Sequence, residues 1–149
     1  MLRKATDLDS EFAYQTKKAA FREYVEQVWG WDEDAQRHLH KKRFAAQDFR
    51  IIQLSGIDIG ILAVVQKSDC LKLNQIYVLP EYQGLGIGTA CVRELIEDAA
   101  RTHIPIRLQV LKVNDRAITF YQRLGFYIID ENETHKMMEK SPKDDGVKS

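Results

Sequence analysis

Segment 83–88 constrains this chain most, because it carries three glycines at alternate positions and reads QGLGIG. It follows a run of strand-like residues that closes at Pro80, and a helical pattern begins where the glycines end. Glycine lets the backbone turn sharply and approach a ligand closely. The free N–H groups and the dipole of a first helical turn attract an anion. The segment therefore predicts a cradle for a pyrophosphate.

Two other glycine-rich motifs fit these letters poorly. A dinucleotide fingerprint of the GxGxxG type fails because Thr89 stands where the third glycine belongs. No GK[ST] follows, so a P-loop is also disfavoured. The simpler alternative, a turn that only links a strand to a helix, stays open.

Hydrophobic periodicity predicts an α/β (α+β) chain with a mixed, strongly twisted sheet and helices on both sides. Segment 71–79 is expected to alternate without interruption and to pair in parallel with 106–111. The expected helices are 10–30, 32–44, 86–100 and 115–124, and the expected strands are 1–5, 49–54, 57–66, 71–79, 104–111, 126–129 and 134–138.

A length of 149 residues suits one domain, placed at 1–140, and residues 141–149 are expected to form a disordered tail. The 22 Lys and Arg balance the 22 Asp and Glu, which disfavours nucleic acid or a membrane surface as partner. The sequence has no run of 18 apolar residues and no signal-peptide pattern, so a cytoplasmic location is expected. Cys70 and Cys91 fit no metal spacing; we expect buried free thiols and no metal.

A second motif lies in segment 114–126. Asn114, Ala117 and Tyr121 are spaced by three and four residues, so they share one face of a helix. Gly125 and Phe126 follow directly. Each residue also has an ordinary structural reading, as an N-cap, a core aromatic or a C-cap. Their combination with the glycine loop makes a ligand site the more specific hypothesis.

Together, strand 74–80, loop 83–88 and segment 114–126 resemble the cofactor-binding core of the GNAT acetyltransferase superfamily. Gln83, Gly86 and Gly88 match its loop pattern directly, and the resemblance covers roughly residues 71–126. It implies a GNAT-like, mostly antiparallel sheet in a single acyl-CoA N-acyltransferase domain. It also implies acetyl-CoA as cosubstrate, without a metal.

The resemblance further implies roles for individual residues. The backbone of strand residues 76–78 is expected beside the pantetheine arm, and the loop amides at the pyrophosphate. Asn114 is expected to contact the arm, and Tyr121 to lie near the thioester sulfur as catalytic general acid, for which a protonated phenol is suited. The implied cofactor-binding set is Ile76, Tyr77, Val78, Gln83, Gly84, Leu85, Gly86, Ile87, Gly88, Thr89, Asn114 and Tyr121.

The general base stays unassigned. Many relatives carry a carboxylate on the strand before the loop, whereas this chain has Lys72 and Asn74 there. The open candidates are Asn74, Glu81, Asp32, Glu33, His38 and His135.

The acceptor is expected to bind against the N-terminal helices. Aromatic rings and acids cluster there and could hold a cationic amine by cation–π and charge attraction. The two Trp side chains could equally seal the core. The expected acceptor residues are Tyr24, Trp29, Trp31, Asp32 and Asn74.

The sequence thus predicts an N-acetyltransferase that moves acetyl from acetyl-CoA to a primary amine of a small molecule or protein, directly within a ternary complex. Two alternatives stay open: a non-catalytic acyl-CoA sensor, and a transferase of another acyl group. A homodimer is also left open.

Overall fold

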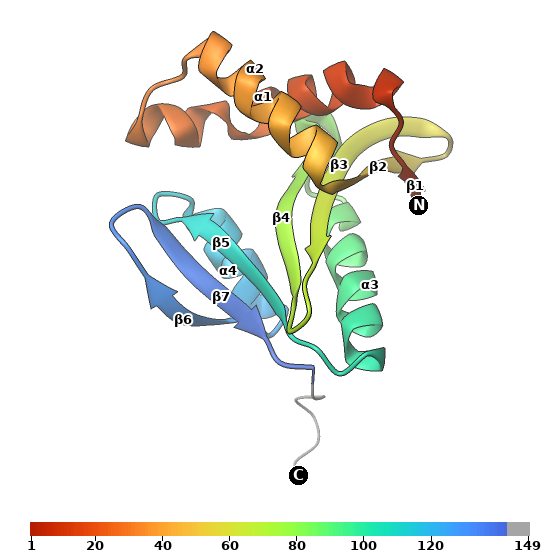
Figure 1. Cartoon of the computed structure of the whole chain (residues 1–149), viewed down its shortest axis with the longest axis vertical. Helices are drawn as coiled ribbons and strands as arrows, with labels where there is room; N and C mark the ends of the chain where they lie inside the picture. The colour runs from red at the N-terminus through yellow and green to blue at the C-terminus, as the bar shows by residue number, and fades with distance from the viewer. Residues whose placement is uncertain (143–149) are drawn as a thin grey trace.

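The computed structural model describes residues 1–142 as a seven-stranded sheet with helices against it (Figure 1). The predicted tail, from residue 143 onward, lies outside the described residues. The strands are β1 (Leu2–Lys4), β2 (Asp48–Leu54), β3 (Ile57–Gln66), β4 (Leu71–Val78), β5 (Ile106–Leu111), β6 (Tyr127–Glu131) and β7 (His135–Lys140). The helices are α1 (Ser10–Val28), α2 (Glu33–Ala46), α3 (Ile87–Arg101) and α4 (Asp115–Arg123), with short 3₁₀ turns at Asp7–Asp9 and Pro80–Tyr82.

The strand order is β1-β2-β3-β4-β5-β7-β6, and all neighbours pair antiparallel except β4 and β5. Between those two strands lies α3, which makes the crossover that parallel pairing requires. The predicted parallel pairing of segment 71–79 with segment 106–111 is therefore confirmed. The mixed, mostly antiparallel sheet is confirmed with it.

Apolar side chains pack on both faces of the sheet. One core joins strand residues to α3 and α4, through side chains such as Val92, Leu95 and Ile118. The other joins Ala13 of α1 to Phe49, Ile51 and their neighbours on β2 and β3. Each face is covered by helices, as the sequence predicted.

Strand β4 departs from the expected uninterrupted alternation. Leu73 pairs with Val64 and Gln75 with Ala63, so Asn74 is the extra residue of a β-bulge. A bulge reverses which face each later side chain occupies. Leu73 therefore belongs to the core under α3, while Tyr77 packs with the core under α1. The expectation that Leu73, Gln75 and Tyr77 share one face was wrong for this reason.

The two parallel strands separate just beyond this bulge. They pair only from Leu71 with Ile106 to Leu73 with Leu108. Figure 1 shows β4 and β5 diverging from these paired ends toward α1 and α2. A bulge bends its strand and increases the local twist, which accounts for the divergence. One backbone edge of β4 after Asn74 is consequently left without a strand partner in the described sheet.

Cys70 and Cys91 are free, buried thiols, as expected. In the part of the chain that the structure describes, no helix combines the length and the apolar character needed to cross a membrane.

Candidate functional site

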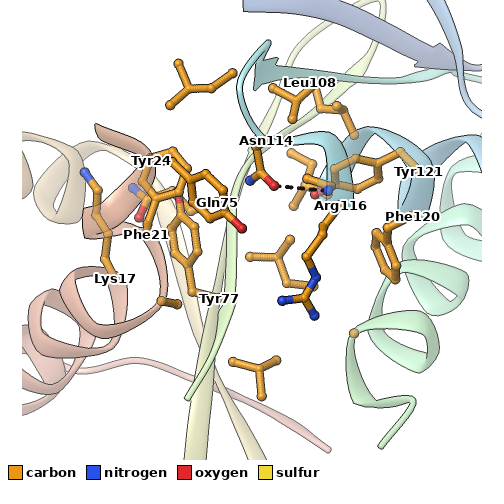
Figure 2. A pocket seen from close by; sticks show the side chains of 18 of the residues that line it. Lys17, Phe21, Tyr24, Gln75, Tyr77, Leu108, Asn114, Arg116, Phe120 and Tyr121 are labelled. Atoms are coloured by element: carbon orange, nitrogen blue, oxygen red, sulfur yellow. Dashed lines mark hydrogen bonds between the residues drawn. The ribbon is translucent and has the colours of Figure 1, made fainter. Parts of the chain in front are cut away.

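A cavity of about 1360 Å³ opens where β4 and β5 separate. Figure 2 shows Lys17, Phe21 and Tyr24 of α1 on one side, and Arg116, Phe120 and Tyr121 of α4 on the other, with Asn114 just before α4. Strand β4 lies between them, carrying Gln75 and Tyr77. The cavity is lined by elements that lie far apart in the sequence, since α1, α2, β4, α3, β5 and α4 all contribute.

The glycine loop forms one end of the cavity. Gly84 and Gly86 both have φ of +79°, a left-handed conformation that a side chain would strain. Gly86 is the N-cap of α3, and no side chain there accepts a hydrogen bond from the first helical turn. The N–H groups of Ile87, Gly88 and Thr89 therefore start an uncapped helix at the cavity wall. Such a terminus suits a phosphate oxygen.

Most of the predicted loop residues line the cavity as the structure describes it, but Leu85 does not. The Gln83 amide Nε2 donates to the Val78 carbonyl at 2.8 Å, which ties the loop to the end of β4. Leu85 is 63% exposed and is not among the residues that line the cavity within the described chain. The other predicted loop residues line it, together with Ile76, Tyr77 and Val78 of β4.

Helix α4 places the second predicted motif on the cavity wall. The Asn114 Oδ1 accepts the backbone N–H of Ala117 at 3.1 Å, so Asn114 is an N-cap whose amide nitrogen does not take part in that bond. Tyr121 is buried between Phe120 and Phe126, with ring centroids 5.1 and 5.4 Å away. Burial raises the pKa of the Tyr121 phenol, because the charged phenolate is poorly solvated there.

Tyr77 brings a second phenol to the same cavity. Its ring packs against Phe21 at 5.1 Å, on the α1 side. Burial raises its pKa, and the nearby Tyr121 raises it further. Two protonated hydroxyls thus approach the cavity from opposite sides. The bulge at Asn74 is what turns Tyr77 to this face.

The predicted acceptor residues are only partly brought together. Tyr24, Trp29 and Asn74 line the cavity, whereas Trp31 and Asp32 do not appear among its lining residues in the described chain. The Trp31 indole donates to Glu33 at 3.0 Å, and the Asp32 carboxylate caps α2 through Ala35. Their polar groups already have partners within the helical pair.

Of the open candidates for a general base, Asn74 and His135 line the cavity. The His135 Nδ1 lies 2.8 Å from the Thr134 hydroxyl oxygen, which in turn lies 3.3 Å from Asn132 Oδ1. The hydroxyl therefore holds the Nδ1 side of the ring. Burial lowers the pKa of His135, so the ring is neutral at pH 7.

Lys17, Arg43 and Gln75 are among the polar residues of the cavity wall that sequence reasoning missed. A signal for Lys17 was present, since it lies four and seven residues before Phe21 and Tyr24 on one helical face. Gln75 was hidden by the bulge, which periodicity does not reveal. Within residues 1–142, no three His, Cys, Asp or Glu side chains are grouped to hold a metal ion.

Comparison with known proteins finds similarity to N-acetyltransferases. Residues 11–126 match the model of the acetyltransferase (GNAT) family. An uncharacterised N-acetyltransferase of Methanocaldococcus jannaschii is 31% identical over 121 residues, which is 76% of this chain and 48% of that protein. Mouse thialysine N-epsilon-acetyltransferase is 39% identical over 62 residues, 41% of this chain and 36% of that protein. The chain thus spans about half or less of these relatives.

Solved structures share the fold. The PaiA N-acetyltransferase of Thermoplasma acidophilum, in complex with coenzyme A, has a TM-score of 0.78 at 18% identity and covers 95% of this chain and 98% of its own. The ribosomal-protein-S18-alanine N-acetyltransferase of Escherichia coli has a TM-score of 0.74 at 18% identity, over 100% and 99% of the two chains.

Proposed function

The chain belongs to the acetyltransferase (GNAT) family, and from this premise we propose that it transfers an acetyl group from acetyl-CoA to a primary amine. The transfer is direct, with cosubstrate and acceptor bound together. One observation carries the proposal: the uncapped start of α3 and the free edge of β4 meet in one cavity. That combination suits a ligand with a pyrophosphate joined to an extended, amide-bearing arm.

The residues present fit such a cosubstrate. The N–H groups from Gly86 to Thr89 would hold the pyrophosphate, helped by the dipole of α3. The backbone of Ile76 and Val78 would pair with the arm, since no strand occupies that edge in the described sheet. Arg93, Arg116 and Arg123 also line the cavity and add positive charge to it. The Asn114 amide would donate to the arm.

The chemistry assigns one proton task to each wall of the cavity. Bound acetyl-CoA supplies an activated acyl carbon with a thiol leaving group. The neutral amine nitrogen forms the new C–N bond, the C–S bond breaks, and the sulfur takes up a proton. Tyr121 supplies that proton, because its raised pKa keeps the phenol protonated at neutral pH. His135, which lines the cavity, accepts the surplus proton of the amine.

His135 is proposed as base because it is the titratable candidate that lines the cavity and is neutral at pH 7. Asn74 lines it as well, and would act only by orienting a water. Glu81 and His38 are exposed, on the 3₁₀ turn Pro80–Tyr82 and on α2. Glu33 is engaged with Lys18 and Arg37.

The amine acceptor is proposed at the α1 side, where Tyr24 and Trp29 line the cavity. By its name, the mouse relative acetylates an ε-nitrogen of thialysine, and a primary amine is the acceptor we propose here too. A cytoplasmic location belongs to the same proposal, because the free thiols of Cys70 and Cys91 suit a reducing compartment.

An acceptor screen with free-thiol release as readout tests this function. Acetyl-CoA is offered with a panel of primary amines, and thiol release above the rate without amine supports the transferase. Tight acetyl-CoA binding with no release across the panel favours the sensor alternative. Propionyl-CoA and succinyl-CoA in the same assay test whether another acyl group is preferred.

A further inference from the structure

The acceptor side of the cavity is positively charged. Lys17 of α1 is only 4% exposed, and its Nζ donates to the neutral Gln36 Oε1 at 3.3 Å. Among residues 1–142 it has no ion pair with a carboxylate, and the one charged group with a marked effect on its pKa is another cation, Arg43. A buried ammonium without a counter-charge is costly. Its place at the wall of a cavity suits a counter-charge that a bound ligand supplies.

Arg43 of α2 adds a second positive charge at the same place. Arg43 lies seven residues after Gln36, the partner of Lys17, and so on the same face of α2. Its positive charge adds to burial in lowering the pKa of Lys17. In the described part of the chain, Arg43 too forms no ion pair with a carboxylate. Both side chains line the cavity.

Two acids of the helices, Glu11 on α1 and Glu33 on α2, are paired with other cations. Glu11 pairs with Arg37 at 2.9 Å, and Glu33 pairs with Lys18 at 2.9 Å and with Arg37 at 3.0 Å. These pairs lie outside the set of residues that line the cavity in the described chain. Glu11 and Glu33 therefore pair with cations away from the cavity, and Lys17 and Arg43 are left without a carboxylate partner among the described residues.

Unpaired hydrogen-bonding groups gather at the same spot. Gln75 is 4% exposed, lines the cavity, and has neither its Nε2 nor its Oε1 hydrogen-bonded within the described residues. The Oε1 of Gln47, also a lining residue, is buried without a partner there. Buried polar groups are normally satisfied. A donor beside two cations is the chemistry that binds an oxyanion.

We propose that Lys17, Arg43 and the Gln75 amide form a carboxylate subsite, so the acceptor is a small amine that also carries a carboxylate, of the amino-acid type. This inference rests on the proposed function, because it names the acceptor of that same cavity. It also replaces the expectation of an acid-lined site for a purely cationic amine. Carboxylate binding would supply Lys17 with its missing counter-charge and Gln75 with an acceptor for its N–H groups.

The test compares amines that differ only in the carboxylate. Lysine is paired with cadaverine, tyrosine with tyramine, and β-alanine with ethylamine, in the thiol-release assay. The carboxylate-bearing member should have kcat/KM about ten- to a hundredfold higher in at least one pair, as for a hydrogen bond to a charged group. In Lys17→Met, the KM of the carboxylate-bearing amine should rise by a similar factor, so that the two members of the pair react equally well. The Kd of acetyl-CoA should not change.

Lys18→Met is the matched control, because Lys18 is the next residue on α1 but pairs with Glu33 rather than facing the cavity. It should keep the preference. Equal turnover within every pair overturns the proposal, as does a preference that survives Lys17→Met. A Lys17→Met variant that loses kcat equally for both members of a pair would make Lys17 part of the proton transfer and would also overturn it.

Failure of the proposed function is distinguished by binding. If no amine releases thiol, the N-acetyl derivatives of the same pairs are titrated calorimetrically into the protein with coenzyme A present. Tighter binding of the carboxylate-bearing derivative, lost in Lys17→Met and kept in Lys18→Met, supports the subsite without any turnover. Absence of that difference overturns it.

Discussion

The Ala117 N–H donates a hydrogen bond of 3.1 Å to the Asn114 side-chain oxygen, so Asn114 caps helix α4. Asn114 also lines the cavity. The two roles are separable. Asn114→Asp keeps the capping oxygen but replaces the amide donor with an anionic oxygen. We expect an unchanged melting temperature and acetyl-CoA affinity weakened about ten- to a hundredfold. Asn114→Ala should in addition lose about 1 kcal/mol of stability. Undiminished affinity in Asn114→Asp would remove the amide from the cosubstrate site.

Gly86 and Gly56 form a second matched pair, because both have positive φ and open space around the missing Cβ. An alanine at either site adopts a strained left-handed conformation, at a cost of about 1–2 kcal/mol. Both variants should therefore melt earlier by similar amounts. Gly86→Ala alone should weaken acetyl-CoA binding, measured by calorimetry. Gly56→Ala lies in the β2–β3 turn, and equal weakening there would contradict the phosphate cradle.

Tyr121→Phe keeps the packed ring and removes the proton that we assign to the leaving sulfur. We expect kcat and kcat/KM to fall together by about a hundred- to ten-thousandfold, with acetyl-CoA affinity nearly unchanged. Tyr77→Phe is the control, since Tyr77 also places a buried phenol at the cavity. A large loss in Tyr77→Phe with a normal rate in Tyr121→Phe would transfer the role of general acid to Tyr77.

His135 should shape the low-pH side of the rate profile. A base accepts a proton only in its neutral form, and burial lowers the pKa of this ring from 6.5. The kcat should therefore rise as the pH passes the pKa of His135, which lies below 6.5. At higher pH the ring is already neutral, and kcat should no longer change because of it. His135→Gln should lose this rise and lower kcat about a hundredfold. If kcat of His135→Gln still rises with pH as in the wild type, the His135 ring is not the base.

Lys17→Met should stabilise the protein while it harms acceptor binding. Burial, and then Arg43, lower the Lys17 pKa from 10.5 to about 8, which corresponds to about 3 kcal/mol against the charged form. Between pH 8 and 10.5 the unfolded chain binds more protons at this site than the folded one, so wild-type stability should rise with pH there. The groups facing Lys17 from α2 include Gln36, His40 and Arg43.

The gain in Lys17→Met should consequently be large at pH 7 and shrink toward pH 10. Thermal or urea unfolding at both pH values measures it, with Lys18→Met as control. A variant less stable than wild type at pH 7 would mean that Lys17 has a stabilising partner, and the subsite would lose its main support.

Local patterns allowed most of the fold to be predicted. The predicted strands 49–54 and 57–66 correspond to β2 and β3, and the N-cap reading in segment 114–126 holds for Asn114. The parallel pairing of β4 with β5 followed from the strand, helix, strand order. Such features depend on residues close in sequence or on general rules of chain connection.

The cavity was harder to predict, because its character depends on a register shift and on distant partners. One extra residue at Asn74 turns Gln75 and Tyr77 toward α1. Trp31 and Asp32 looked available for a ligand, yet their polar groups are used within the helical pair. Lys17 shares a helical face with Phe21 and Tyr24, and it is buried at the cavity wall without a carboxylate partner among the described residues. No pattern in the sequence reports which charges will find partners.

The short contact between β4 and β5, three residue pairs long, makes the free protein a sheet of two lobes joined along a narrow seam. On the proposed function, the cosubstrate arm would extend the pairing beyond these three residue pairs and form hydrogen bonds with backbone groups of β4 that have no strand partner in the described sheet. Ligand binding to the folded state alone adds about 2.7 kcal/mol of stability at a hundred times Kd. Resistance to proteolysis and amide exchange would then rise and fall with the acetyl-CoA supply, making the protein's lifetime a readout of metabolic state.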